Sequence, residues 1–399
     1  MQSNDFYSKV DRRELPQDDP FVTDWRISRP GPPTHLGVTA YEPERFWRSY
    51  TFACSFGDES ARLIDMEGRE VHRWEFQQGL GLHWHLAEML PNGHVLAITS
   101  SGGYHASKNR LQNLIELDWN SNLVWREPAA AHHDFERLPN GNTLVVCHGT
   151  AVYPHIVPVP TLYDYIQEIT PDHKVAWEWH FAEHVEEVRG LVSPLWLPPG
   201  GGDYPHINTV ESLPDTPLGR RDERFRAGNI LLSGRHIHTI FIVDPRTDKI
   251  VWAWGPGEIL GQHEPTLLEN RNILLFDNGH GNAHAGGEED RPFSRVIELE
   301  PVSGKIVWEY KADPPESFVS YVASGNQRLP NGNTFVCAAN WQGAIGRLFE
   351  VAPEGRIVWE YWNPDKKRYY RARRYPADLV ERLLEECGSC GAALTHAHP

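Results

Sequence analysis

Residues 261–279 read GQHEPTLLENRNILLFDNG and combine a histidine with a turn and an apolar run. His263 stands about six residues before the turn, and residues 273–276 after it are all large and apolar. Consecutive apolar residues bounded by polar turn residues are typical of a buried β-strand. The stretch therefore predicts two strands joined by a tight turn, with His263 near the start of the first strand.

The same construction recurs along the chain, in most copies around an Asn-Gly turn. An Asn-Gly pair between apolar runs is the strongest short signal of a β-hairpin. The copy SGNQRLPNGNTFVC (324–337) has Ser324 at the histidine position. The copies with histidine are HWHLAEMLPNGHVLAI (83–98, with His85), HHDFERLPNGNTLVV (132–146, with His133) and PHINTVESLP (205–214, with His206 and a longer interval).

A second motif alternates with the first. It consists of two strands joined by a polar turn, and its second strand ends in or near a tryptophan. One copy is RVIELEPVSGKIVWEY, residues 295–310. The copies recur roughly every 50 residues, apart from one long interval, which is within the range of propeller repeats. Four strands per repeat, six times, indicate an all-β, six-bladed β-propeller. The tryptophans of the six copies are Trp74, Trp125, Trp177, Trp252, Trp308 and Trp359.

We expect three segments along the chain. Residues 1–47 are polar and Pro-rich and are expected to form an N-terminal arm, residues 48–364 the propeller, and residues 365–399 a basic segment, a helix and a tail. The sixth tryptophan copy (347–362) lacks a histidine-type half, and the apolar strand at 49–56 has no partner of its own. We expect strand 49–56 to close the ring by joining that sixth blade, because closure removes exposed sheet edges.

The C-terminal segment contains two features. Its basic run DKKRYYRARR, residues 365–374, is expected to be a solvated face. Residues 376–386 place their apolar side chains on one side of a helical wheel. We therefore predict a short helix docked on the outside of the propeller.

The amino-acid composition limits the classes of molecule that the protein is expected to bind. The net charge of -16 argues against a nucleic-acid or anionic membrane surface. No stretch approaches the roughly 20 apolar residues that a membrane helix needs, and the first residues lack the apolar core of a secretory signal. We expect a cytoplasmic protein that acts on a small, aromatic molecule; its oligomeric state does not follow from the sequence.

The chain contains 21 histidines, and the repeat places four of them at nearly equivalent positions. The innermost strand of each propeller blade lines the central channel, so residues at the start of these strands should converge on one mouth. Because Ser324 replaces histidine in one blade, the fold itself does not require an imidazole there. We predict catalytic roles for His263, His133, His206 and Arg235, and substrate-binding roles for Asn208, His85, His236, His238 and Glu264.

Two types of reaction use a group of imidazoles and an arginine of this kind. In the first, one neutral imidazole attacks a sulfuryl group, while arginine, asparagine and other imidazoles hold its oxygens and no cofactor is needed. Arg235 suits this role because its planar guanidinium matches two acceptor oxygens. In the second, imidazoles bind a transition metal (Fe, Cu, Mn or Zn) at the propeller axis for a lyase or oxygenase reaction. Its ligands would be His85, His133, His206 and His263. A propeller that binds a ligand without catalysis is the third alternative.

The motifs HHDFERLPNGN, DYPHIN, ILLSGR and GQHEPTLLENRNILLFDNG, in this order, resemble the arylsulfotransferase family of bacterial six-bladed propeller enzymes. With the GKIVW-type strands, the resemblance covers residues 60–362. It implies sulfuryl transfer through a central histidine on an aromatic substrate. In this comparison His263 matches the histidine that becomes sulfated. The residues that match those binding the sulfuryl oxygens and assisting proton transfer are His133, His206, Asn208 and Arg235.

Overall fold

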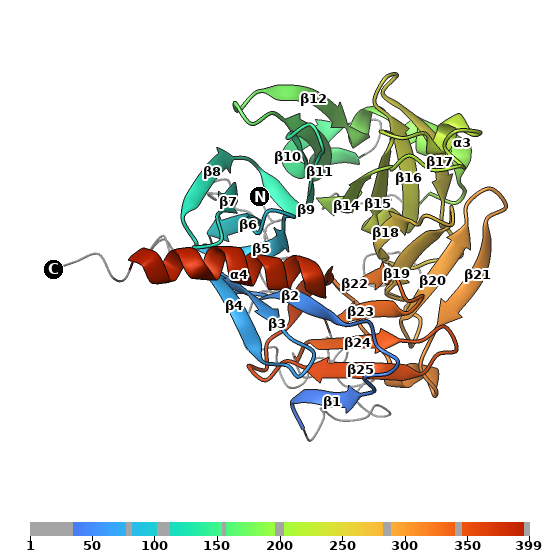
Figure 1. The fold of residues 1–399 in the computed structure, drawn as a ribbon. Helices are drawn as coiled ribbons and strands as arrows, with labels where there is room; N and C mark the ends of the chain where they lie inside the picture. Colours follow the sequence, from blue (N-terminus) through green and yellow to red (C-terminus); the bar gives the residue numbers. More distant parts are fainter. Residues whose placement is uncertain are drawn as a thin grey trace, which may run out of the picture.

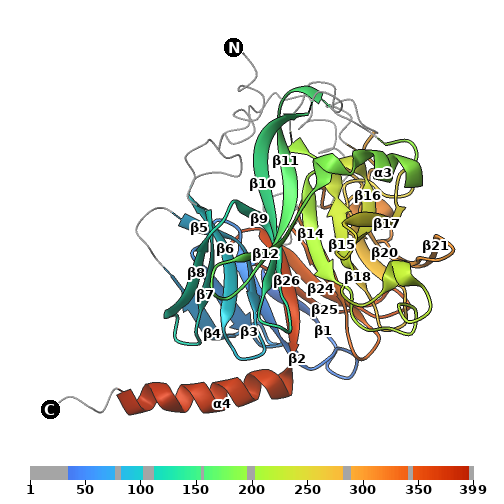
Figure 2. The same ribbon diagram turned by 90° about the horizontal axis from the view of Figure 1, so that it is seen from above.

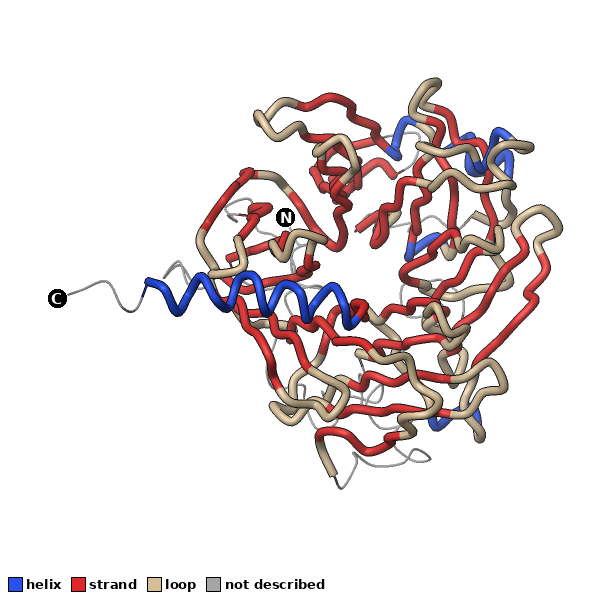
Figure 3. Tube along the Cα trace, viewed as in Figure 1, coloured by secondary structure: helices blue, strands red, loops and turns tan. Residues whose placement is uncertain are grey.

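Six sheets stand around a central axis, with their innermost strands facing one another (Figure 1). The computed structural model describes residues 35–76, 82–101, 112–153, 157–195, 203–281, 289–339 and 345–394. Strands form the ring throughout this part of the chain, and its helices are short apart from the C-terminal one (Figure 3). The predicted six-bladed β-propeller is confirmed.

Three blades consist of four strands that follow one another along the chain. The first contains β5 (Leu82–Met89), β6 (Val95–Ser101), β7 (Gln112–Leu117) and β8 (Leu123–Pro128). The second contains β14 (Ile207–Ser212), β15 (Ile230–Gly234), β16 (Thr239–Asp244) and β17 (Lys249–Trp254). The third contains β18 (His263–Leu267), β19 (Ile273–Asp277), β20 (Arg295–Glu300) and β21 (Lys305–Tyr310).

Two further blades have a fifth strand. One contains β9 (Ala131–Arg137), β10 (Thr143–Tyr153), β11 (Val157–Ile169) and β12 (Val175–His180), with the short β13 (Asp203–Tyr204) parallel to β11. The other contains β22 (Gly325–Arg328), β23 (Thr334–Ala338), β24 (Arg347–Val351) and β25 (Ile357–Trp362). Its edge is extended by β1 (Gly37–Tyr41), which lies within the segment expected to be an arm.

The remaining blade joins the two ends of the chain, and here the expected pairing is wrong. Strand β2 (Ser49–Ser55) pairs with β3 (Ser60–Ile64), which is followed by β4 (Glu70–Glu75), and not with the sixth tryptophan copy. The other partner of β2 is β26 (Tyr369–Pro376), which is the innermost strand of this blade. The sequence did not show this because β26 lacks both the histidine and the Asn-Gly turn that mark the other innermost strands.

Only the first part of the basic run is the solvated face that we expected, since residues 365–367 are exposed. In β26, Arg371 and Arg374 are buried, and Arg374 lies 4.2 Å from the ring centroid of Trp359. Burial of arginine is costly unless the charge is paired. Arg371 satisfies this condition through Asp134, 2.7 Å away across the channel. Basic residues in this run thus belong to the propeller interior.

The recurrent tryptophans connect neighbouring blades. The indole nitrogen of Trp125 donates a hydrogen bond to the carbonyl of Pro171 at 3.2 Å, and that of Trp308 donates to Pro353 at 3.1 Å. Trp359 donates in the same way to Met66 at 2.8 Å. In each case the acceptor lies in the outer turn of the next blade. Tryptophan suits these positions because it both fills apolar space and donates this bond, although Nε1 of Trp74 has no hydrogen-bond partner among the described residues.

The two ends of the channel differ. The long hairpin β10–β11 rises at one end of the ring, and α4 (Ala377–Leu394) lies at the opposite end (Figure 2). Helix α4 is longer than predicted and packs Val380 and Leu383 into the core around Trp74 and Trp119. The other α-helix, α3 (Val185–Leu191), packs against β17. No helix in the described part of the chain is long and apolar enough to cross a membrane.

Candidate active site

The histidine positions lie at the start of the innermost strands, where these strands depart from regular pairing. The pairing of β5 with β6 shifts register at His85, and similar irregularities occur in β9, β14 and β18. A bulge of this kind re-aims a side chain, and bulges are frequent beside active sites. Backbone φ is 60° at His133, 63° at His206 and 81° at Ser324. Non-glycine residues hold this left-handed conformation only where the surrounding structure imposes it.

The histidine rings form a chain across the channel mouth. The ring centroids of His85 and His133 are 5.1 Å apart, and those of His133 and His206 are 4.5 Å apart. His236 continues the chain 4.3 Å beyond His206. Burial, reinforced by the neighbouring imidazoles, lowers the pKa of His133 well below its ordinary value and that of His85 to about 3. These two imidazoles are therefore neutral at pH 7.

His263 occupies a defined tautomer. Its Nδ1 lies 2.8 Å from Oδ1 of Asn278 and 3.1 Å from the carbonyl oxygen of Gly261. Both partners only accept, so Nδ1 carries the proton and Nε2 keeps its lone pair. The amide of Asn278 is itself fixed, because its nitrogen donates to the carbonyls of Ser320 at 2.6 Å and Ala323 at 3.0 Å. Burial and then the charge of Arg235 lower the pKa of His263 well below its usual range, which keeps the ring neutral.

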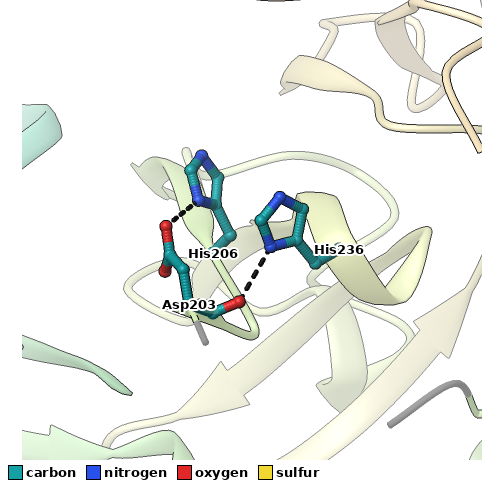
Figure 4. A group of neighbouring side chains, drawn as sticks. All are labelled: Asp203, His206 and His236. Carbon is teal, nitrogen blue, oxygen red and sulfur yellow. Dashed lines mark hydrogen bonds and ion pairs between the residues drawn. The ribbon is translucent and has the colours of Figure 1, made fainter. Parts of the chain in front are cut away.

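His206 is paired with a carboxylate. Nδ1 of His206 donates to Oδ2 of Asp203, as Figure 4 shows. Burial alone would raise the pKa of Asp203, but the facing His206 outweighs it and lowers that pKa. A carboxylate in this position orients the ring and stabilises its imidazolium form. His206 is thus equipped to accept or release a proton at Nε2.

The ring of His133 contacts a carboxylate only indirectly, through a second histidine. Its Nδ1 contacts Nδ1 of His132, whose Nε2 lies 3.0 Å from Oδ1 of Asp164. The other carboxylate oxygen of Asp164 accepts the backbone N–H of Ile207 at 2.6 Å. His132 thus stands between His133 on one side and a carboxylate on the other, and its Nδ1 contact fixes the ring of His133. A second neutral imidazole therefore lies at the mouth.

Arg235 is held by a neutral histidine. Its Nη1 donates to Nε2 of His236 at 2.7 Å, and its Nη2 lies 3.4 Å from the carbonyl oxygen of Tyr321. Nδ1 of His236 in turn donates to the backbone carbonyl of Asp203 at 2.8 Å (Figure 4). Burial, followed by the charges of His206 and Arg235, lowers the pKa of His236 well below its ordinary value. His236 can therefore accept from the guanidinium and orient it.

The remaining predicted residues have different surroundings. Asn208 is fully buried and donates to the carbonyl of Gln262 at 2.8 Å, which ties it to the strand that carries His263. Nδ1 of His238 accepts the backbone N–H of Gly261 at 3.0 Å, so His238 supports the loop before His263. Glu264 faces a lower layer of the channel, where its carboxylate pairs with Arg373 at 2.9 Å.

That lower layer closes the channel beneath the histidines. Arg371 lies 2.7 Å from Asp134 and 3.2 Å from Glu264, which also accepts the backbone N–H of Asn326 at 2.6 Å. Gly325 permits this approach, because a Cβ there would lie 1.8 Å from Oε2 of Glu264. Below the layer is a cavity of about 170 Å³, whose lining includes Glu136.

Sequence reasoning missed three groups of this site. Asp203 and Asp164 support His206 and His132, but single aspartates carry no motif. Tyr370 belongs to β26, which the sequence placed outside the propeller, and its ring lies 4.6 Å from that of His85. The interval of six residues from Tyr370 to Pro376 matches that from His133 to Pro139, and this spacing was the available signal.

The structure brings one set of potential metal ligands together. Ligand atoms of Asp203, His206 and His236 all lie within 4.8 Å of one another, the one such group of His, Cys, Asp or Glu in the described residues (Figure 4). His85, His133 and His263 are not members of this group. Oδ1 of Asp203 has no hydrogen-bond partner among the described residues. Arg235 opposes a cation here, since its guanidinium contacts Nε2 of His236.

Fold and site together define a six-bladed propeller whose channel mouth is lined by imidazoles, an arginine and carboxylates. The family model for arylsulfotransferase (ASST) matches residues 87–364, and the chain belongs to this family. Membership suggests an arylsulfotransferase-like enzyme whose substrate is an aryl-sulfate small molecule. A search of curated proteins found no match.

One solved structure shares the fold at low sequence identity, and others are similar to a lesser degree. A protein of unknown function from Bacteroides caccae is 15% identical, with a TM-score of 0.52 over 82% of this chain and 98% of its own. Apo AztD from Citrobacter koseri is 9% identical, with a TM-score of 0.40 over 83% of this chain and 99% of its own. Cobalt-substituted Synechocystis ACO is 11% identical, with a TM-score of 0.40 over 86% and 74% of the two chains. The first of these likenesses shows the fold alone.

Proposed function

We propose that the protein transfers a sulfuryl group from an aryl sulfate to an acceptor hydroxyl, with His263 as the group that is transiently sulfated. The observation that carries this proposal is the fixed tautomer of His263. Nδ1 donates to Asn278, so the lone pair of Nε2 is available for attack while the ring stays neutral. A neutral, oriented imidazole is an effective nucleophile.

In the first half of the reaction, Nε2 of His263 forms a bond to the sulfur as the bond between sulfur and the aryl oxygen breaks. The electron pair of the broken bond leaves on the aryl oxygen, which takes a proton from the imidazolium of His206. Asp203 stabilises that imidazolium through its bond to Nδ1. Arg235, whose charge acts on His263, neutralises the charge on the sulfuryl oxygens.

In the second half, the acceptor hydroxyl gives its proton to Nε2 of His206 and its oxygen bonds to the sulfur. The bond between sulfur and Nε2 of His263 breaks, and the electron pair returns to the imidazole. The neutral imidazole of His133 lies beside that of His206, 4.5 Å away between ring centroids. The two half-reactions leave the protein unchanged and need no cofactor.

The test uses an aryl sulfate such as 4-nitrophenyl sulfate, first without an acceptor. We expect intact-mass and peptide mass spectrometry under alkaline conditions to find one sulfuryl group on His263. H263A should lose the adduct and turnover, whereas the control H173A should keep both, because the side chain of His173 is about half exposed and pairs with Glu127 on an outer strand. Full turnover by H263A would contradict the proposal.

A second candidate is a metal-dependent lyase or oxygenase. The observation that favours it is the group formed by Asp203, His206 and His236, because histidine and carboxylate ligands suit first-row transition metals. It requires Arg235 to leave Nε2 of His236. Metal analysis of the purified protein separates the two candidates. Near one equivalent of metal that is lost in D203N would favour the metalloenzyme, and activity that survives chelation without bound metal would exclude it.

A further inference from the structure

Tyr370 completes the ring of side chains at the channel mouth. It lies on β26, six residues before Pro376, as His85 and His133 lie six residues before their turn prolines. Its ring centroid is 4.6 Å from that of His85 and 5.9 Å from that of His133. The closing strand of the propeller therefore contributes a phenol where the neighbouring blades contribute imidazoles.

The hydroxyl of Tyr370 has no hydrogen-bond partner among the residues that the structure describes, although the side chain is 5% exposed. Buried tyrosine hydroxyls usually find a partner, and an unsatisfied one destabilises the fold. The ring itself packs in the apolar cluster with Leu86 and Phe135, and the backbone carbonyl accepts the N–H of Ser324 at 3.1 Å. Phenylalanine would keep all of these contacts, so the hydroxyl is not needed for packing.

The phenol of Tyr370 keeps its proton at neutral pH. Burial raises the pKa of Tyr370 above its usual value, although the nearby charge of Arg371 acts in the opposite direction. The group is thus a neutral phenol at pH 7, which can donate a hydrogen bond but does not act as a base. The charge of Arg235 acts in the same direction as that of Arg371.

We propose that the hydroxyl of Tyr370 donates a hydrogen bond to a sulfuryl oxygen of the bound aryl sulfate. This inference rests on the proposed function. The ligand oxygen supplies the acceptor that the described protein residues do not, and Arg235 neutralises the charge of the same group. Tyr370 is then a substrate-binding donor that the chain provides from its C-terminal strand.

The experiment compares Y370F with Y369F, in which the same atom is removed from the adjacent buried tyrosine. Tyr369 packs in a different cluster, with Phe335 and Trp359. Binding of 4-nitrophenyl sulfate is measured by calorimetry in the H263A background, where no transfer occurs. We expect Y370F to weaken binding by roughly ten- to a hundredfold, the effect of losing a hydrogen bond to a charged group. Y369F should bind with unchanged affinity.

Thermal unfolding provides the second measurement. Without ligand, Y370F should be at least as stable as the parent protein, because it removes an unsatisfied buried group. Its stabilisation by aryl sulfate should be smaller than that of Y369F. Lower stability of Y370F without ligand would overturn the inference, since the hydroxyl would then stabilise the fold. Unchanged affinity for aryl sulfate would also overturn it, since the hydroxyl would then not bind the substrate.

The two proposals can fail separately. If H263A binds the aryl sulfate without transferring it and Y370F binds equally well, only the role of Tyr370 is wrong. If the parent protein binds inorganic sulfate but transfers no sulfuryl group, the proposed function is wrong. In that case weaker sulfate binding by Y370F still supports the donor role.

Discussion

Oδ1 of Asn278 accepts a hydrogen bond from Nδ1 of His263 at 2.8 Å, and this contact determines which nitrogen of His263 faces the channel. The amide is fixed from two sides by the carbonyls of Ser320 and Ala323. Asn278 follows β19, whereas His263 begins β18, so the two strands of one hairpin supply the histidine and the group that orients it.

Asn278→Ala should therefore lower kcat for aryl-sulfate turnover by roughly ten- to a hundredfold, the usual effect of removing a group that orients a functional histidine. KM should change little, because Asn278 positions His263 and does not contact the substrate. Steady-state kinetics checks this. Asn122→Ala is the matched control, since Asn122 bonds Asp118 in an outer turn. A change in KM alone would count against the positioning role.

Asp203→Asn should reduce kcat on the order of 10²- to 10⁴-fold, as loss of the carboxylate behind a catalytic histidine does in other enzymes. The physical reason is the loss of charge stabilisation of the His206 imidazolium. The control is Asp215→Asn, an exposed carboxylate paired with Arg220. Kinetics and metal content are measured on the same samples. Loss of activity together with loss of a bound metal would instead favour a metal-dependent lyase or oxygenase.

Glu136 should make stability depend on pH. Burial raises its pKa to about 8, whereas an unfolded glutamate titrates near its ordinary value of about 4.3. Between these values the folded state binds the proton and the unfolded state does not, so this group's contribution to stability decreases as pH rises. Glu136→Gln should remove this decrease.

The measurement is thermal unfolding of both proteins between pH 5 and 9. We expect E136Q to gain roughly 1–2 kcal/mol relative to the parent at the alkaline end and little near pH 5, where Glu136 is protonated in the fold. The amide oxygen can still accept the backbone N–H of Ser212. An equal difference at all pH values would show that Glu136 does not titrate in this window.

Gly325→Ala should destabilise the protein by roughly 1–3 kcal/mol, because the new Cβ would overlap the carboxylate of Glu264. Glu264 has little freedom to move, since it is held by Arg371, Arg373 and the N–H of Asn326. Denaturant unfolding measures the change. Gly190→Ala in α3 is the control, because a Cβ there meets no atom within 4 Å. Equal stability of the two variants would contradict the close approach.

The ring closure shows where the repeat pattern failed. Five innermost strands are marked by a histidine near their start or by an Asn-Gly turn after their end. In contrast, β26 reads YYRARRYP and resembles an exposed basic run. The buried pairing of Arg371 with Asp134 joins residues 237 positions apart, which local patterning does not reveal. The same pairing closes the channel below the histidines. The sequence therefore predicted the number of blades but not the strand that completes the last one.

The repeats alone determined the propeller, its six blades and the strand ends on which His85, His133, His206 and His263 stand, because strand periodicity and turn chemistry are local properties. The tertiary structure decided which polar groups meet there. Asp203, Asp164, Asn278 and Tyr370 reach the mouth from separate strands and loops. The hydrogen bonds of Asp203 and Asn278, and the burial that keeps His133 and His263 neutral, depend on closure of the ring by β26 against β2, a contact between the two ends of the chain.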